Sequence, residues 1–148
     1  MRLNLGSGSE PRAAGVVNVD IADLPTVDVV HDLDVTPWPF DDHSAEQIWA
    51  QDVFEHLNDP IGFMTECHRV LETGGELMMK VPHFLHQDAY TDPTHKRFCT
   101  EHTWDYWIKG TVLYERHNAA YSRGRHCTFT LEKRAVAAGS IFILLRKN

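Results

Sequence analysis

The feature of the sequence that most constrains the fold is the stretch from Arg2 to Gly8, which reads RLNLGSG. Leu3 and Leu5 alternate with polar residues, as in a short strand with one buried face. Gly6 and Gly8 follow directly and allow backbone angles that other residues avoid, so the strand ends in a tight bend. Such a bend brings backbone N–H groups close to a ligand. The same residues also suit a plain turn between two strands.

Further strand patterns follow along the chain. We predict strands over residues 16–21, 28–33, 47–53 and 76–82, and a closing hairpin formed by strands at about 127–133 and 140–146. Strands that alternate with helical or irregular connections indicate an α/β fold with a mainly parallel sheet. The length of 148 residues fits one domain, spanning residues 1–148.

One helix has clear signals. Asp59 is a favourable N-cap and Pro60 a favourable first residue. The residues Phe63, Cys67, Val70 and Leu71 then recur at helical spacing and predict one buried stripe. We expect the glycine pair at 74–75 to end this helix.

The connection between Gly8 and Asp20 is unusually short. Only eleven residues separate them, whereas a helix rises about 1.5 Å per residue and a helical crossover needs roughly ten residues or more besides its turns. We therefore expect a shortened first crossover and a reduced wall of any pocket beside it. A second subunit could cover this gap, so a homodimer is one possible assembly.

Charge and composition exclude some classes of protein. The net charge of −7 disfavours strong non-specific binding to nucleic acids. No apolar run is long enough to span a bilayer, and the sequence enters its first strand without a secretory leader. We therefore expect a cytoplasmic location, or a host cytoplasm if a phage encodes the protein. The three cysteines, Cys67, Cys99 and Cys127, form neither a disulfide framework nor a paired zinc motif.

Polar residues mark the ends of the predicted strands. In parallel sheets ligands bind beyond the carboxyl ends of the strands. Asp20 ends the second strand, where a carboxylate is well placed to accept the hydroxyl groups of a ribose. Asp32 ends the third strand, and Gln51 and Asp52 end the fourth. Asp20 and Asp32 would equally suit ordinary turns at strand ends.

An ordered set of motifs gives the chain a resemblance to a known family. The motifs are LNLGSG (3–8), VNVDI (17–21), VHDL (30–33), PWPF (37–40), FEHL (54–57) and ECHRVLETGG (66–75). Together they resemble class I S-adenosylmethionine-dependent methyltransferases, which have a Rossmann-like, seven-stranded sheet. With Asp92-Pro93-Thr94-His95 after the fifth strand, the chain is similar to a small microbial and phage branch of that family.

The resemblance implies S-adenosylmethionine as cofactor and S-adenosylhomocysteine as product. It implies that the glycine bend passes under the methionine part, that the carboxylate after the second strand holds the ribose, and that later positions border the adenine and the methyl group. The implied cofactor residues are Asn4, Gly6, Ser7, Gly8, Asp20, Ile21, Asp32, Leu33, Gln51, Asp52 and His56. Asn4 stands where the family commonly has an acid, and Glu10 where it has a third glycine.

The segment 83–114 is polar, aromatic and rich in histidine, and we expect it to form a lid or substrate loop with aromatic side chains around a partly apolar pocket. A histidine there could remove a proton from the methyl acceptor, because it titrates near neutral pH. We predict His95 or His86 in this role, with Asp88 beside them; His83, Asp92 and His102 are further candidates. The same residues could bind a divalent metal, but their spacing matches no tight ligand motif, so we predict no metal site.

The predicted function is methyl transfer to oxygen or nitrogen of a small-molecule or sugar-like acceptor. The chain lacks the Asn/Asp-Pro-Pro-Tyr/Phe and Pro-Cys motifs with which members of the resembled family methylate nucleic-acid bases. Two other classes stay open. One is a protein that binds S-adenosylmethionine without transferring methyl, as a regulator or a cofactor-degrading enzyme. The other is a metal-dependent hydrolase that uses the histidine-rich loop.

Overall fold

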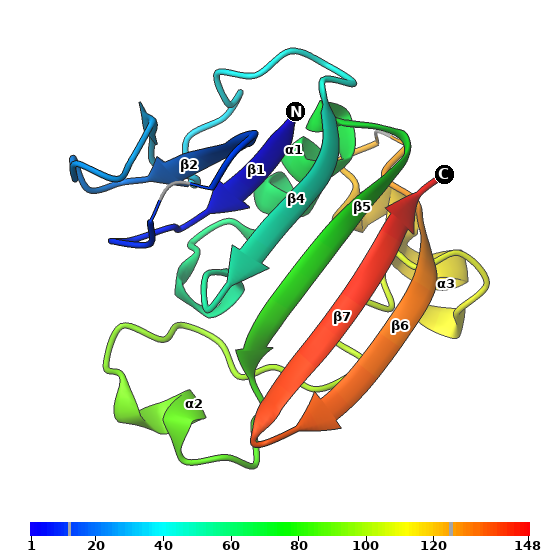
Figure 1. The fold of residues 1–148 in the computed structure, drawn as a ribbon. Coiled ribbons are helices and arrows are strands. Elements are labelled where there is room, and N and C mark those ends of the chain that lie inside the picture. The colour runs from blue at the N-terminus through cyan, green and yellow to red at the C-terminus, as the bar shows by residue number, and fades with distance from the viewer. Residues whose placement is uncertain (12, 125) are drawn as a thin grey trace.

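The protein is built on one seven-stranded sheet with the strand order β3-β2-β1-β4-β5-β7-β6, seen in Figure 1. The computed structural model describes residues 1–11, 13–124 and 126–148. Strands β1 to β5 pair in parallel, and β7 pairs antiparallel with both β5 and β6. The strands are β1 (Arg2–Leu5), β2 (Val16–Asp20), β3 (Val29–Val30), β4 (Ala45–Gln51), β5 (Leu71–Pro82), β6 (Phe129–Ala137) and β7 (Ser140–Lys147). The predicted α/β fold and closing hairpin are confirmed.

The helices are few and short. They are the 3-10 turn η1 (Phe54–His56), α1 (Pro60–Val70), α2 (Asp88–Thr91) and α3 (Val112–Tyr121). As predicted, Asp59 caps α1, and its Oδ1 accepts a hydrogen bond from the Gly62 amide at 2.9 Å. Within the described residues, no helix is long and apolar enough to cross a membrane.

Several predicted boundaries differ from the structure. The third strand covers only Val29–Val30, because residues 31–34 bend away into turns. Helix α1 ends at Val70 and β5 begins at once, so the glycine pair at 74–75 lies within a strand and does not end the helix. In the segment 83–114, which we expected to form a lid or substrate loop, residues 101–107 form turns and α3 begins after a Thr111 cap.

The handedness of parallel crossovers decides which face of the sheet each connection covers. A right-handed crossover places its connection on one face when the chain moves toward β3 and on the other face when it moves toward β5. The β4–β5 crossover carries α1, and residues 31–44 return across the same face. The β1–β2 and β2–β3 crossovers belong to the opposite face, where the described residues form no helix. This confirms the shortened first crossover.

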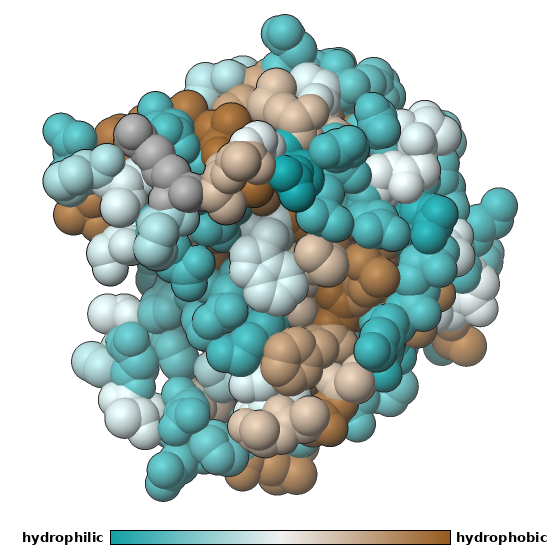
Figure 2. Space-filling view, in the orientation of Figure 1, coloured by the Kyte–Doolittle hydropathy of each residue, from teal (hydrophilic) through white to brown (hydrophobic). Residues whose placement is uncertain are grey.

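The opposite face is therefore uncovered over β4, β5, β7 and β6, which lie toward the viewer in Figure 1. Figure 2 shows hydrophobic residues gathered on this face. A shallow groove there is lined mainly by side chains of these four strands, among them Trp49, Met78, Ala135, Phe142 and Leu144. These side chains are partly exposed, unlike their neighbours that point toward α1.

Over β1 and β2, where the described connections form no helix, a buried polar side chain holds the connections against the sheet. Asn18 is 1% exposed, and its Nδ2 donates to the carbonyl oxygens of Glu10 at 3.1 Å and Thr26 at 3.0 Å. Its Oδ1 accepts from the Asn4 amide at 3.2 Å. The two short connections are thus fastened to the sheet by hydrogen bonds, each contributing on the order of 1 kcal/mol.

The hydrophobic core lies between the sheet and α1. Four of its aromatic members pack in a row. Trp38 meets Phe63 edge-on with centroids 5.4 Å apart, Phe63 meets Phe54 edge-on at 6.0 Å, and Phe54 lies tilted against Trp104 at 5.5 Å. Trp104 and Trp107 are 0% and 3% exposed. The expectation that the aromatic side chains of the segment 83–114 lie around a pocket is therefore wrong for Trp104 and Trp107, since these two belong to the core.

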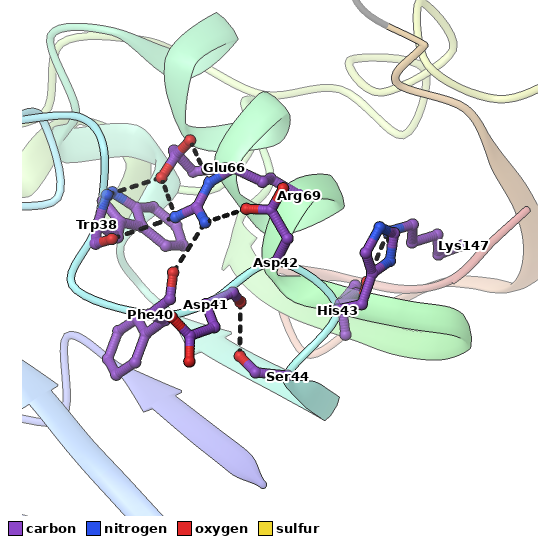
Figure 3. Close-up of polar contacts among 10 residues, drawn as sticks. Trp38, Phe40, Asp41, Asp42, His43, Ser44, Glu66, Arg69 and Lys147 are labelled. Atoms are coloured by element: carbon purple, nitrogen blue, oxygen red, sulfur yellow. Dashed lines mark hydrogen bonds and ion pairs between the residues drawn. The ribbon is translucent and has the colours of Figure 1, made fainter.

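A buried ion pair fastens the β3–β4 connection to α1 (Figure 3). The Glu66 carboxylate accepts from Arg69 Nε at 2.9 Å and Nη2 at 2.7 Å, and from the Trp38 amide at 2.7 Å. Arg69 also donates to the carbonyl oxygens of Trp38 and Phe40 and to the Asp42 carboxylate. These carboxylates hold the pKa of the Arg69 guanidinium above its usual range.

Replacing Arg69 by alanine leaves the buried Glu66 carboxylate without its cation and frees residues 38–42. We expect Arg69→Ala to lower the free energy of unfolding by about 3–5 kcal/mol in urea denaturation. The matched control is Arg146→Ala, because Arg146 pairs with Glu76 and Glu132 on the surface, where such pairs contribute about 1 kcal/mol or less. Equal losses for the two variants would contradict the role of the pair.

A second group on this side is the partly buried His68 of α1. Its ring packs edge-on against Phe129 with centroids 5.3 Å apart. Burial, together with the nearby charges of Lys147, His43 and His126, lowers the pKa of His68 to about 4. Asp42 lines the same pocket as His68. The folded protein therefore holds His68 neutral at pH values where the unfolded chain protonates it.

This difference predicts a loss of stability in acid. Between pH 6.5 and 4, unfolding takes up a proton at His68, so the free energy of unfolding falls as the pH falls, by at most about 3 kcal/mol. Below pH 4 this contribution is constant. We expect His68→Gln to flatten the pH dependence in this window, measured by urea denaturation from pH 7 to pH 4. An unchanged slope would show that His68 is not the titrating group.

Candidate functional site

The glycine bend after β1 is built as the sequence predicts. Gly6 and Gly8 have φ values of +64° and +53°, in the left-handed region that favours glycine. A Cβ atom at Gly6 would lie 2.3 Å from Cγ2 of Val53, which follows β4. The bare backbone at Gly6 thus lets the ends of β1 and β4 approach each other closely.

Asp20, at the end of β2, lies directly beside this bend. Its Oδ2 accepts from the Gly8 amide at 2.8 Å, and its Oδ1 accepts from the Ala22 amide at 2.9 Å. Each carboxylate oxygen can accept a further hydrogen bond, because it has two lone pairs. Asp20 therefore fixes the bend and still offers oxygens to a ligand.

A cleft of about 380 Å³ opens at the carboxyl ends of β1, β2 and β4. Its volume falls within the range of small-ligand pockets, which is about 300–1,000 Å³. It is lined by Gly6, Asp20, Ile21, His31, Asp32, Leu33, Asp34, Asp52, Val53, His56, Leu57, Asn58 and Lys96. Seven of the residues implied by the family resemblance are among them, namely Gly6, Asp20, Ile21, Asp32, Leu33, Asp52 and His56.

The other four cofactor residues that the family resemblance implies do not line this cleft. Asn4 is hydrogen-bonded to Asn18 on the other face of the sheet. Gln51 donates to its neighbour Asp52 at 3.3 Å and is exposed. Ser7 is 3% exposed, and Gly8 contributes its amide to Asp20. Ser7 and Gly8 still belong to the bend at the edge of the cleft.

The cleft is strongly acidic. Four carboxylates line it, those of Asp20, Asp32, Asp34 and Asp52, against the one lysine Lys96. Asp52 lies 3.2 Å from the Lys80 ammonium. Such a lining favours a cationic ligand and disfavours one with several phosphates.

Asp34 is a residue of this wall that the sequence analysis missed. Its carboxylate accepts from the Asn58 amide at 2.8 Å and the Asp59 amide at 2.8 Å, and so joins the loop after β3 to the start of α1. Burial would raise the pKa of Asp34, but these hydrogen bonds and the charge of Lys96 outweigh it and lower the pKa. A signal was present, since Asp34 follows Asp32 at the end of a strand.

Behind one end of the cleft lies a group that we call the Glu-His-His cluster, formed by Glu55, His56 and His95. His56 lines the cleft, and its ring meets that of His95 edge-on with centroids 4.6 Å apart. The Nε2 atom of His95 lies 4.0 Å from Oε1 of Glu55. One potential ligand atom from each residue lies within 4.8 Å of those of the other two. The sequence analysis named His56 and His95 but not Glu55.

Burial governs the protonation of this cluster. It raises the pKa of Glu55 to about 7, with a contribution from the charge of Asp52. Burial and the neighbouring His95 lower the pKa of His56. The imidazole that faces the cleft is therefore neutral at pH 7 and keeps a lone pair for a proton or a ligand.

The other predicted catalytic residues lie elsewhere. His86 packs against the turn between β6 and β7, close to Gly139. Asp88 begins α2 with its side chain 64% exposed, 3.3 Å from His86. Neither lines the cleft. Figure 1 places the segment that carries them beyond the carboxyl ends of β4 and β5.

The cleft fits S-adenosylmethionine on three structural observations. The backbone at Gly6 has no room for a side chain, and its bend lies beside a carboxylate with free acceptor capacity. The lining carboxylates match a ligand that carries a sulfonium and an ammonium group. Exposed Ile21, at 67%, offers an apolar surface for a flat ring at the mouth.

Comparison with known proteins agrees with this geometry. Residues 8–79 match the family model described as a methyltransferase domain. A search among curated protein sequences finds no significant match. Among solved structures, a protein of Bacillus halodurans C-125, provisionally assigned as a methyltransferase, is 16% identical with a TM-score of 0.67, covering 99% of this chain and 91% of its own.

Two further structures show how far the fold is shared. A S-adenosylmethionine-dependent methyltransferase of Thermotoga maritima, for which histamine N-methylation is suggested, is 13% identical with a TM-score of 0.66, covering 99% of this chain and 82% of its own. The cyclase SpnF is 14% identical with a TM-score of 0.66, covering 99% and 73%. At these identities the likeness shows the fold. With the domain match over residues 8–79 and the acidic cleft beside the glycine bend, the chain is similar to class I S-adenosylmethionine-dependent methyltransferases.

Proposed function

We propose that this methyltransferase acts on oxygen or nitrogen of a small-molecule or sugar-like acceptor. The observation that carries the proposal is the cleft at the carboxyl ends of β1, β2 and β4, which is lined by Gly6 of the glycine bend and by His56 of the Glu-His-His cluster. S-adenosylmethionine supplies a methyl group that its sulfonium already activates. The protein's task is then to align the acceptor with that methyl group and to deal with the acceptor's proton.

The residues that would hold the cofactor follow from the chemistry of the wall. Asp20 offers its remaining lone pairs to the ribose hydroxyls. Ile21 and Leu33 border the adenine, and Asp32 can accept from its amino group. Asp52, after β4, faces the cationic methionine part. The backbone at Gly6 allows this part to lie close to the bend.

The acceptor end of the cleft would lie at the Glu-His-His cluster. His56 is the histidine on the wall, and the predicted base His95 lies behind it with its side chain 8% exposed. On the segment that carries His95, Tyr90 and Phe98 stack with centroids 4.5 Å apart while each stays at least half exposed, and Leu85 is 78% exposed. These apolar surfaces on the segment 83–99 suit a small, partly apolar acceptor better than a polyanion.

A second candidate is a protein that binds S-adenosylmethionine without transferring its methyl group. The specific observation in its favour is the first crossover, which forms no helix in its described residues and leaves that wall open. The cyclase SpnF shares the fold, so the fold alone does not fix the reaction. Incubation of protein and cofactor without acceptor separates the cases: breakdown supports a degrading enzyme, and stable binding a binding protein. The homodimer, the cytoplasmic location and the phage branch stay predictions, and light scattering measures the first.

Asp20 is the residue whose loss should weaken cofactor binding most specifically. We expect Asp20→Asn to raise the Kd for S-adenosylmethionine by about 10-fold or more, because a charge-assisted hydrogen bond contributes about 1.5–3 kcal/mol. Calorimetric titration measures this. The matched control is Asp23→Asn, an exposed carboxylate in the following loop, which should leave the Kd unchanged. Equal affinities for parent and Asp20→Asn would contradict the assignment of the ribose site.

His56 tests the acceptor end of the cleft. We expect His56→Ala to lower kcat by about 100-fold or more, as for a group that handles the acceptor's proton, while the Kd for S-adenosylmethionine changes little. The assay is methyl transfer from labelled cofactor to panels of small hydroxylated and amine acceptors. If labelled methyl appeared only on tRNA or DNA, the proposed acceptor class would be wrong.

A further inference from the structure

The three side chains of the Glu-His-His cluster are of the kinds that bind metal ions. Glu55 and His56 come from η1, after β4, and His95 comes from the loop after α2, almost forty residues later. Two imidazoles and one carboxylate are the side chains of catalytic zinc sites and of other divalent transition-metal sites. In such sites the protein supplies three ligands and leaves a further position open.

Hydrogen bonds at the Nδ1 atoms of both histidines indicate which ring nitrogens carry a proton. His95 Nδ1 lies 2.9 Å from the Ala89 carbonyl oxygen, which can only accept, so we assign the proton to Nδ1. His56 Nδ1 lies 2.9 Å from Thr94 Oγ1, and Thr94 in turn donates to Asp92 Oδ1 at 2.7 Å. Nδ1 of His56 therefore carries a proton as well. Both Nε2 atoms keep their lone pairs, and partners of this kind orient metal-binding histidines.

The carboxylate of Glu55 is the second, independent observation. Glu55 is 2% exposed, yet neither of its oxygens has a hydrogen-bond partner in the described structure. A buried carboxylate without a partner costs free energy, so such groups are normally paired or coordinate a metal. The 4.0 Å from Oε1 to His95 Nε2 is too long for a hydrogen bond. It is close to the separation of about 3.4 Å that two ligands take around a tetrahedral ion at 2.1 Å.

The cluster is also open on one side. His56 lines the cleft, whereas Glu55 and the side chain of His95 are buried behind it. Asp52, on the same wall, adds negative charge that favours a cation. An ion bound by the three side chains would thus face the cleft with its remaining position.

We propose that Glu55, His56 and His95 bind one divalent transition-metal ion of the zinc class, with a coordination position open to the cleft. The binding itself does not depend on the proposed function. If methyl transfer is correct, that open position lies where an oxygen or nitrogen of the acceptor enters, and this part of the inference rests on the proposed function. In the metal-bound protein Nε2 of His56 is a ligand, so His56 acts on the acceptor through the ion and does not itself take the acceptor's proton.

The experiment uses the full chain, freed of metal with a chelator and titrated with Zn²⁺ by calorimetry, with Co²⁺ absorption as a spectroscopic readout. We expect one Zn²⁺ per chain and a higher Tm on binding. Glu55→Gln and His95→Ala should weaken Zn²⁺ binding by on the order of 100-fold or more. The matched control is His117→Ala, an exposed histidine of α3, which should keep the affinity of the parent.

The Glu55→Gln variant separates loss of metal binding from loss of folding. In the metal-free state it should be at least as stable as the parent, because it removes a buried charge that lacks a partner. The proposal is overturned if the parent binds no stoichiometric Zn²⁺, or if Glu55→Gln and His95→Ala bind Zn²⁺ as tightly as the parent. Titration of metal-free protein with S-adenosylmethionine is scored separately, so that failure of cofactor binding and failure of metal binding are distinguishable.

Discussion

The structure depends on one constraint, the handedness of the crossovers between parallel strands. That rule sends the β4–β5 helix and residues 31–44 to one face of the sheet and the first two connections to the other. Because those two connections are short, the second face has no helical layer in the described residues. The core is therefore one-sided, and aromatic side chains from Trp38 to Trp104 fill the space between the sheet and α1.

Where the described connections between strands form no helix, hydrogen bonds from side chains hold these connections in place. Asn18 fastens the first two connections, Asp20 fixes the glycine bend, and Asp34 joins the loop after β3 to the start of α1. On the other face, Glu66 and Arg69 hold the returning chain against α1. Each of these groups acts on backbone atoms, which positions loops accurately without much buried apolar area. The same carboxylates give the cleft its negative charge, so the groups that shape the site also select a cationic ligand.

In the Glu-His-His cluster, by contrast, a buried carboxylate has no hydrogen-bond donor beside it among the described residues. Glu55 is buried without a hydrogen-bond partner, whereas Asp34 and Glu66 are held by several donors. Because the half-buried Asp34 and the buried Glu66 both have hydrogen-bond donors, the carboxylate of Glu55 is an informative exception. Its place behind His56 joins it to the cleft, where the chemistry of the acceptor would take place.

The sequence by itself determined the sheet, the cap at Asp59, the missing first helix and the position of Asp20 beside the glycine bend. These features depend on local backbone preferences and on residue spacing, which can be read along the chain. Only the tertiary structure decided that Trp104 and Trp107 are core residues, that Asp34 joins two loops, and that Glu55 faces His95. Those relations join residues from separate segments of the chain, and the sequence pattern carries no record of which side chains the folded sheet brings together.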